Sequence, residues 1–254
     1  MIDLLELNMI KEFTITETAN KLAVNAQTLR RWDKSGRLKA KRKETGRVSR
    51  YYYHENEIED FLSTNFSVLL KIGRKWAFDS NPFEIPRRFY CSDKSIFKAR
   101  LSRFEFDLSQ KANFAEIFPL IVAIAGEIGN NSFDHNLGNW PDVPGAFFGY
   151  NIDERKVVLA DRGQGLLKTL KQVRPELSDH QEALKVAFTE WISGRAPEAR
   201  GNGLKYVREV VANYGFKLFF QSGDAVLNLN KKNKTLEIEK NHNFVKGVFA
   251  LINY

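Results

Sequence analysis

The sequence predicts a two-domain α+β protein, in which a small helical domain precedes a larger domain of helices packed on a sheet. Three observations predict this class. The basic excess is confined to one short segment near the start of the chain. Residues 117–125 form an apolar run that is long enough for a buried helix. Runs of β-branched and aromatic residues, typical of strands, follow from residue 146 to the end.

Composition is that of an ordinary globular protein, with 43% hydrophobic and 28% charged residues among 254. The one cysteine, Cys91, excludes an internal disulfide and a cysteine metal cluster, and we expect it to be a small buried side chain. No apolar run approaches the roughly eighteen residues of a membrane span, and the acidic start is unlike a signal peptide. We therefore expect a soluble cytoplasmic protein with no membrane partner.

The positive charge has an uneven distribution. Residues 28–50 contain ten Lys and Arg against two acids, a net charge of +8, which equals the net charge of the whole chain. A basic block can be a solvated surface, but its concentration in one small domain favours a polyanionic partner.

Residues 13–63 contain signals for two short helices and a hairpin. Thr16 is the expected N-cap of a helix over 17–23, and Asn25 caps a second helix over 26–35 that Gly36 closes. A basic hairpin is expected over 38–53, turning at 44–46, and a closing helix over 55–62.

This region resembles the MerR/excisionase-type winged helix-turn-helix through residues 14–22, 28–32, 36–38 and 46–51. The resemblance implies that the second helix enters a major groove of double-stranded DNA and that the hairpin, the wing, follows the backbone. Amides and arginines of the helix are the candidates for base edges and phosphates, and basic residues of the wing for phosphates. The DNA-binding candidates are Asn25, Gln27, Thr28, Arg30, Arg31, Lys41, Arg42, Lys43, Arg47, Arg50 and Tyr51. Because no long heptad run follows, a homodimer is left open.

Residues 64–111 contain no motif with recognisable chemistry. Residues 66–72 extend the closing helix in this interpretation, 79–86 are rich in turn formers, and 91–103 form a helix. The strict alternation at 104–108 predicts the first strand of the second domain. The predicted domains are therefore 1–66, a connector over 67–103, and 104–254.

The second domain is expected to begin with a helix over 114–136, with Pro119 near its start. Strands over 146–151 and 156–160 form a hairpin, and helices follow within 165–189. A loop over 191–201 is a candidate lid, and a helix starts at Leu204. The expected end is an antiparallel sheet with strands over 216–221, 225–229 and 248–252, covered by helices on one face.

The second predicted domain contains three polar motifs. Glu127, Asn131 and Asp134 are spaced to share one helix face. Asp161, Gly163 and Gly165 follow a strand, and Gly201, Asn202, Gly203 and Leu204 open a helix. Each motif alone is compatible with a helix end, a β-turn or a loop. In this order and spacing they resemble the Bergerat-type (GHKL) ATP-binding fold, so the predicted fold is a winged helix-turn-helix followed by a GHKL α/β sandwich.

The GHKL resemblance assigns a role to each motif. It implies that Glu127 activates water, that Asn131 holds Mg2+ for bound ATP, and that Asp134 orients charged groups or water. It implies that Asp161 accepts the adenine amino proton while Gly163 and Gly165 let the backbone approach. The phosphate-binding candidates are Arg195, Arg200, Gly201, Asn202, Gly203 and Leu204. His135 is expected to be a rim or structural residue.

These assignments suggest an ATP-dependent DNA-binding regulator of prokaryotic, nucleoid-associated type, with ATP hydrolysis as a candidate activity. The absence of a phosphate-accepting histidine helix argues against a sensor histidine kinase. We also expect no transducer domain, which argues against a full topoisomerase or mismatch-repair clamp. Two alternatives stay open: a serine/threonine protein kinase similar to the anti-sigma kinases, with a protein partner, and an adaptor that does not hydrolyse ATP.

Overall fold

The computed structural model describes residues 11–45, 48–190, 203–231 and 236–254. The chain divides into two compact units: Met1–Ile72 with Phe83–Arg88, and Gly73–Pro82 with Phe89–Tyr254. Residues 67–103, predicted as a connector, are shared between the two units. Within the described residues, no helix is long and apolar enough to span a bilayer.

The first unit contains the helices and the hairpin that the sequence predicts. Its three strands pair antiparallel in the order β1-β3-β2, so the wing hairpin extends a small sheet. The elements are β1 (Glu12–Thr14), α1 (Ile15–Lys21), α2 (Ala26–Ser35), β2 (Lys41–Thr45), β3 (Val48–His54), α3 (Glu55–Thr64) and the first part of α4 (Phe66–Phe78).

Local capping fixes the ends of α1 and α2. The predicted cap at Thr16 is wrong, because Thr14 and Glu17 form a reciprocal capping box that starts α1 two residues earlier. Asn25 is the N-cap of α2, as expected, and its side chain accepts from the Thr28 N–H at 2.8 Å. Gly36 closes α2 in the left-handed conformation at φ 78°, also as expected.

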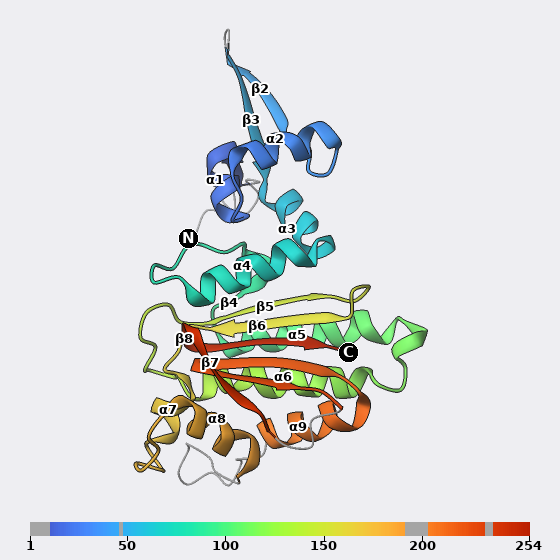
Figure 1. The fold of residues 1–254 in the computed structure, drawn as a ribbon. Helices are drawn as coiled ribbons and strands as arrows, with labels where there is room; N and C mark the ends of the chain where they lie inside the picture. Colours follow the sequence, from blue (N-terminus) through green and yellow to red (C-terminus); the bar gives the residue numbers. More distant parts are fainter. Residues whose placement is uncertain (1–10, 46–47, 191–202, 232–235) are drawn as a thin grey trace, which may run out of the picture. The chain divides into compact units, whose positions relative to one another are not determined.

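The second unit is a five-stranded sheet with helices, in the order β4-β5-β6-β8-β7, and every neighbouring pair is antiparallel. Figure 1 shows α5 and α6 running alongside the strands, with α7, α8 and α9 grouped near β7. The elements are β4 (Tyr90–Cys91), α5 (Lys94–Ser109), α6 (Phe118–Asp134), β5 (Ala146–Asn151), β6 (Lys156–Asp161), α7 (Gly165–Leu170), α8 (His180–Thr189), α9 (Gly203–Tyr214), β7 (Lys217–Leu229) and β8 (Ile238–Asn253). Two short 3-10 turns, Arg87–Phe89 and Ala112–Phe114, complete the described elements.

The strand predicted over 104–108 is wrong, because these residues form the last turns of α5. Phe104 and Leu108 are one helical turn apart and both are fully buried, whereas Phe106 between them is 55% exposed. The apolar residues that alternate in the sequence therefore lie on two sides of one helix, with Phe104 and Leu108 on its buried side. Asp93 starts this helix by accepting from the N–H groups of residues 95 and 96.

Two further predicted elements, the strands over 216–229 and the helix extension over 66–72, differ in the structure. The strands predicted over 216–221 and 225–229 are one strand, β7, whose register with β8 shifts between Ser222 and Ala225. Gly223 lies in this irregularity with φ 62°, a conformation that favours glycine. Residues 66–72 begin a separate helix, α4, because Asn65 leaves the helical conformation and ends α3.

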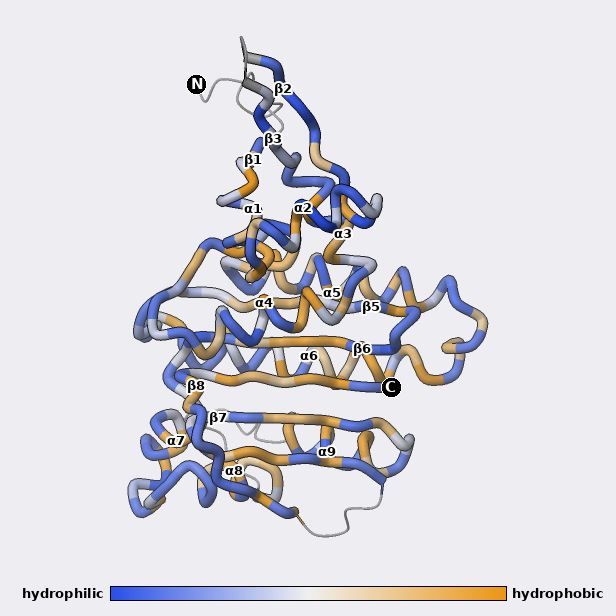
Figure 2. Tube along the Cα trace, turned by 45° about the horizontal axis from the view of Figure 1, so that its top comes forward, coloured by the Kyte–Doolittle hydropathy of each residue, from blue (hydrophilic) through white to orange (hydrophobic). Residues whose placement is uncertain are grey.

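The sheet is buried on both faces, although helices were predicted on one face alone. Phe148 of β5 lies against Phe97 and Phe104 of α5, with ring centroids 5.4 and 6.1 Å away. Its neighbour Phe147 points to the other face, where it contacts Trp76 at the end of α4. Figure 2 shows the resulting apolar character along β6 and the second half of β8, in contrast to the hydrophilic first half of β8 and the hydrophilic wing strand β2. Two covered faces explain why these strands are apolar without alternation.

The close packing of α5 on α6 yields a first prediction. A Cβ on Gly129 would lie 2.1 Å from the ring of the fully buried Phe97, whereas a Cβ on Gly126 would lie 3.2 Å from the end of Leu101. We expect Gly129→Ala to lower the free energy of unfolding by about 1–3 kcal/mol through overpacking. Gly126→Ala is the matched control, which should be neutral or stabilising by up to about 1 kcal/mol. Denaturant unfolding of both variants checks this, and equal effects would contradict the packing described.

Candidate functional site

A pocket in the second unit brings together several of the predicted nucleotide-binding residues. It contains about 360 Å³ of empty space, part of which opens to solvent. Its walls come from α6, the turn after β6, α7, α9 and strands β7 and β8. The lining residues are Ile128, Asn131, Ser132, His135, Asn136, Asp161, Gly165, Leu166, Thr169, Leu204, Phe220 and Val248. The pocket is therefore apolar on most sides and has a few converging polar groups, as ligand sites commonly do.

Asp161 is the acidic group of this pocket and is only 2% exposed. It is the last residue of β6, and it accepts from the Ser132 hydroxyl at 2.7 Å and from the Gly163 N–H at 2.8 Å. Burial raises the pKa of its carboxyl to about 6, although these hydrogen bonds act in the opposite direction. Gly247 of β8 permits this position, because a Cβ there would lie 2.0 Å from Asp161 Oδ1.

Asn136 fastens the turn over residues 161–165 to the end of α6. Its amide donates to the Ser132 carbonyl at 2.7 Å, and its carbonyl oxygen accepts from the Gln164 N–H at 2.7 Å. Gly163 must be glycine here, since a Cβ would lie 2.1 Å from the Asn136 amide. Sequence analysis missed both Ser132 and Asn136. The available signal was their spacing of four residues at the end of an apolar helix, directly beside Asn131.

Glu127 lies against the first residue of α9. A Cβ on Gly203 would lie 2.2 Å from Glu127 Oε2, so the carboxylate contacts the backbone where this helix begins. Asn131, one turn further along α6, lines the pocket together with Leu204. The structure thus brings Glu127, Asn131 and the start of α9 to one region, while Asp161 and Gly165 line the same pocket.

The remaining predicted residues are placed differently. Asp134 forms an ion pair with Lys94 at the start of α5 and is outside the set of described residues that line the pocket. His135 lines the pocket, and burial lowers the pKa of its imidazole. The lid candidates Arg195 and Arg200, and the motif residues Gly201 and Asn202, lie outside the described residues.

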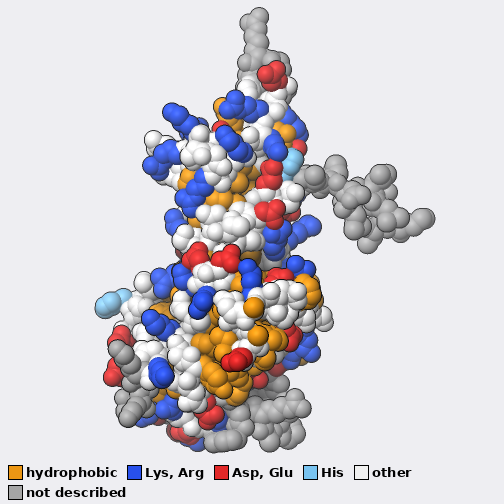
Figure 3. All heavy atoms as spheres, turned by 90° about the vertical axis from the view of Figure 1, so that its right-hand side faces the viewer, with side chains coloured by type: hydrophobic (Ala, Val, Ile, Leu, Met, Phe, Trp, Pro, Cys, Tyr) orange, Lys and Arg blue, Asp and Glu red, His pale blue; other side chains and the backbone are white. Residues whose placement is uncertain are grey.

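The second candidate surface is α2 of the first unit. Gln27, Arg30 and Arg31 are exposed, while Leu29 faces the core. The Asn25 side-chain oxygen accepts from the Thr28 N–H and hydroxyl, and Arg31 donates to the same hydroxyl at 3.3 Å. Asn25 and Thr28 therefore also stabilise the helix start. Figure 3 shows Lys and Arg side chains spread over this unit, with acidic groups between them.

Basic residues of the wing are paired with carboxylates of their own unit. Lys41 pairs with Glu57 at 2.9 Å, Arg42 lies 3.8 Å from Asp33, and Lys43 pairs with Glu12. A hydrogen bond from Lys43 lowers the pKa of the Glu12 carboxyl. The basic side chains remain 47–63% exposed, so these pairs are weak and a phosphate can replace the carboxylate.

Two further wing candidates lie on β3. Arg50 is exposed, and the ring of Tyr51 lies 5.1 Å beneath the Arg42 guanidinium. Arg47 lies outside the described residues.

Comparison with known proteins supports the helix-turn-helix assignment of the first unit directly. A family model described as a helix-turn-helix domain matches residues 12–65. The chain is also similar to the Type II methyltransferase M.Eco47II of Escherichia coli, with 21% identity over 231 residues. That alignment covers 84% of this chain and 52% of the relative, so the chain spans about half the relative's length. No solved structure matches the chain significantly. The N-terminal part therefore contains a helix-turn-helix domain, a class that binds DNA.

The buried Asp161 gives a prediction about stability and pH. Since its folded pKa is about 6, above the ordinary value of an aspartate, its ionisation opposes folding, and stability falls as pH rises from about 4 to 6. Asp161→Asn removes this penalty, and the Ser132 hydroxyl can turn to accept from the new amide. We expect the variant to be more stable than wild type at pH 8 by roughly 2–3 kcal/mol, with the difference shrinking below pH 5.

Denaturant unfolding of both proteins at pH 4.5 and pH 8 (values on either side of the shifted pKa) measures this difference. If Asp161→Asn is more stable than wild type by the same amount at both pH values, burial does not raise the pKa of the Asp161 carboxyl.

Proposed function

We propose that this chain is a DNA-binding regulator that binds Mg-ATP in the pocket of the second unit, and that its nucleotide state alters DNA binding or assembly. The observation that carries the proposal is the buried carboxylate of Asp161 in an apolar pocket beside α6 and α9. A carboxylate has capacity for about four hydrogen bonds, so Asp161 can accept an adenine amino proton in addition to its donors from Ser132, Gly163 and the Val248 backbone.

The other end of the pocket suits the phosphates and the metal ion. Asn131 lines the pocket with an amide oxygen, and Mg2+ needs few protein ligands because phosphate and water supply the rest. Gly203 begins α9, whose N-terminal N–H groups and dipole favour an anion. The order of these residues along α6, β6 and α9 supports the GHKL assignment made from the sequence.

The position of Glu127 suits a role in ATP hydrolysis. Glu127 is half-buried against the backbone of Gly203, near the helix end proposed to hold phosphate. A carboxylate in this position can take a proton from an attacking water if the two come within hydrogen-bond distance. Glu127 is therefore the candidate general base, and an ATPase reaction is part of the proposal.

Calorimetric titration with Mg-ATP tests the nucleotide site. We expect wild type to bind, Asp161→Ala to lose binding, and Glu127→Ala to bind like wild type but to lose turnover. The physical reason is that Asp161 contacts the base, whereas Glu127 acts only on the water. Absence of binding by wild type would refute the nucleotide site and leave a DNA-binding adaptor. Transfer of labelled phosphate to a protein partner, in place of release, would favour the kinase alternative.

The DNA surface has its own test. Arg50→Ala should weaken binding to duplex DNA by a similar factor whatever the DNA sequence. It should also reduce the slope of log affinity against log salt by about 1, because one phosphate contact is lost. Lys217→Ala is the matched control, since Lys217 is an exposed cation on a strand of the second unit. Fluorescence anisotropy across a salt series measures both slopes. Equal slopes for the two variants would place the DNA contact elsewhere.

Methyl transfer is the second candidate function, favoured by the similarity to a Type II methyltransferase. Such an enzyme would need a methyl donor in place of ATP. Titration of the same wild-type protein with S-adenosylmethionine distinguishes the two. Binding of that compound, with no binding of ATP, would replace the proposal above.

A further inference from the structure

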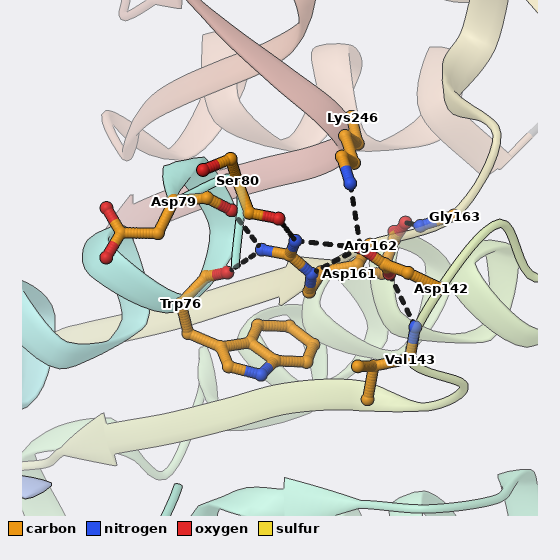
Figure 4. Close-up of polar contacts among 9 residues, drawn as sticks. All are labelled: Trp76, Asp79, Ser80, Asp142, Val143, Asp161, Arg162, Gly163 and Lys246. Atoms are coloured by element: carbon orange, nitrogen blue, oxygen red, sulfur yellow. Dashed lines mark hydrogen bonds and ion pairs between the residues drawn. The ribbon is translucent and has the colours of Figure 1, made fainter. Parts of the chain in front are cut away.

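Arg162 stands out because its guanidinium is completely buried and is surrounded by acceptors. Nε and Nη2 donate to Asp142 Oδ2 at 3.0 and 2.7 Å. Nη1 donates to the carbonyls of Trp76 and Asp79, the latter at 2.8 Å, and Nη2 donates to the Ser80 carbonyl at 3.3 Å. Figure 4 shows these contacts converging on one side chain. A buried guanidinium is tolerated only with this degree of pairing.

The position of Arg162 in the chain joins two regions of the second unit. It directly follows Asp161 and precedes Gly163, so it belongs to the turn that forms part of the pocket. Because successive side chains of an extended segment point in opposite directions, Arg162 leaves the pocket side and reaches the opposite face of the sheet. There it meets the carbonyls at and beyond the end of α4. The turn therefore contributes Asp161 to the pocket, and the next residue, Arg162, contacts the end of α4.

Arg162 acts as a side-chain cap for α4. The last carbonyls of a helix have no partners within it, and the Trp76 carbonyl is one of these. Helix α4 runs from Phe66 to Phe78 without a break, so it contains residues of both units. Asp142 completes the cluster, since it also pairs with Lys246 at 2.9 Å. Burial opposes ionisation of Asp142, but hydrogen bonds from Arg162, Val143 and Lys246 lower the pKa of its carboxyl.

We propose that Arg162 is a positioning residue that couples the nucleotide pocket to α4, so that ATP binding changes DNA affinity through this helix. The inference rests on the proposed function, since it requires an adenine nucleotide beside Asp161. Movement of the turn over residues 161–165 on nucleotide binding shifts Arg162, which carries the end of α4 with it. By thermodynamic reciprocity, DNA bound to the first unit alters nucleotide affinity by the same factor.

The first experiment uses hydrogen–deuterium exchange on the full-length wild-type protein, with and without saturating Mg-ATP. Peptides that cover residues 76–82 should change their exchange rate together with peptides that cover 161–165. Unchanged exchange over 76–82, in a protein that calorimetry shows to bind ATP, overturns this inference and leaves the proposed function standing. No ATP binding overturns both.

The second experiment measures the coupling factor, the ratio of DNA affinities with and without saturating Mg-ATP. The probe is a random-sequence duplex of about 30 base pairs, roughly three helical turns. We expect at least about 5-fold coupling in wild type. Arg162→Met should bring the ratio to about 1, meaning no coupling free energy remains. Arg162→Lys keeps the charge but lacks the planar fork of donors, so it should give an intermediate ratio.

Lys246→Met is the matched control for these variants. It removes a cation from the same Asp142 carboxylate, but its hydrogen bond goes to that carboxylate and the α4 carbonyls keep their Arg162 bonds. The control should couple like wild type. An Arg162→Met protein that couples like wild type, or a Lys246→Met protein that loses coupling equally, contradicts the proposed route. If Arg162→Met does not fold, the Arg162→Lys ratio and the exchange experiment decide.

Discussion

Burial of the Asp161 carboxylate is the constraint on which the architecture of the second unit depends. A charge in this position costs free energy, and the surroundings are arranged to reduce that cost. Ser132 of α6 and the Gly163 N–H supply hydrogen bonds, while Gly247 of β8 leaves the space that the carboxylate occupies. Helix α6, the end of β6 and β8 are thereby held in one relative position. A polar group that is costly to bury, and is nevertheless kept, is typical of a functional site.

Much of the fold followed from the sequence because its signals are local. The caps at Asn25 and Gly36, the β5–β6 hairpin and the start of α6 near Pro119 each depend on a few neighbouring residues. The run over 104–108 was misassigned because a short aromatic alternation fits both a strand and a helix. Burial of Phe104 and Leu108, with Phe106 exposed, resolves it in favour of the helix.

The candidate site was predictable only as far as its motifs. Asn131, Asp161 and Gly165 could be named because their residue types and order match a known pattern. Ser132 and Asn136 showed only a spacing of four residues, and their importance comes from contacts with residues 29 and 28 positions away. Arg162 was hidden for the same reason, because its three carbonyl acceptors lie more than eighty residues earlier in the chain. Long-range polar contacts leave no periodic pattern for sequence analysis to detect.

Under the proposed function, the paired cations of the wing have a consequence for binding to arbitrary DNA sequences. Glu57, Asp33 and Glu12 act as built-in counterions for Lys41, Arg42 and Lys43. Each exchange of a carboxylate for a phosphate gains less than the neutralisation of an unpaired cation would gain. Residence on arbitrary sequences is shortened accordingly. If the proposed function holds, rapid dissociation favours searching along DNA, and long dwell times are reserved for sites where α2 adds contacts of its own.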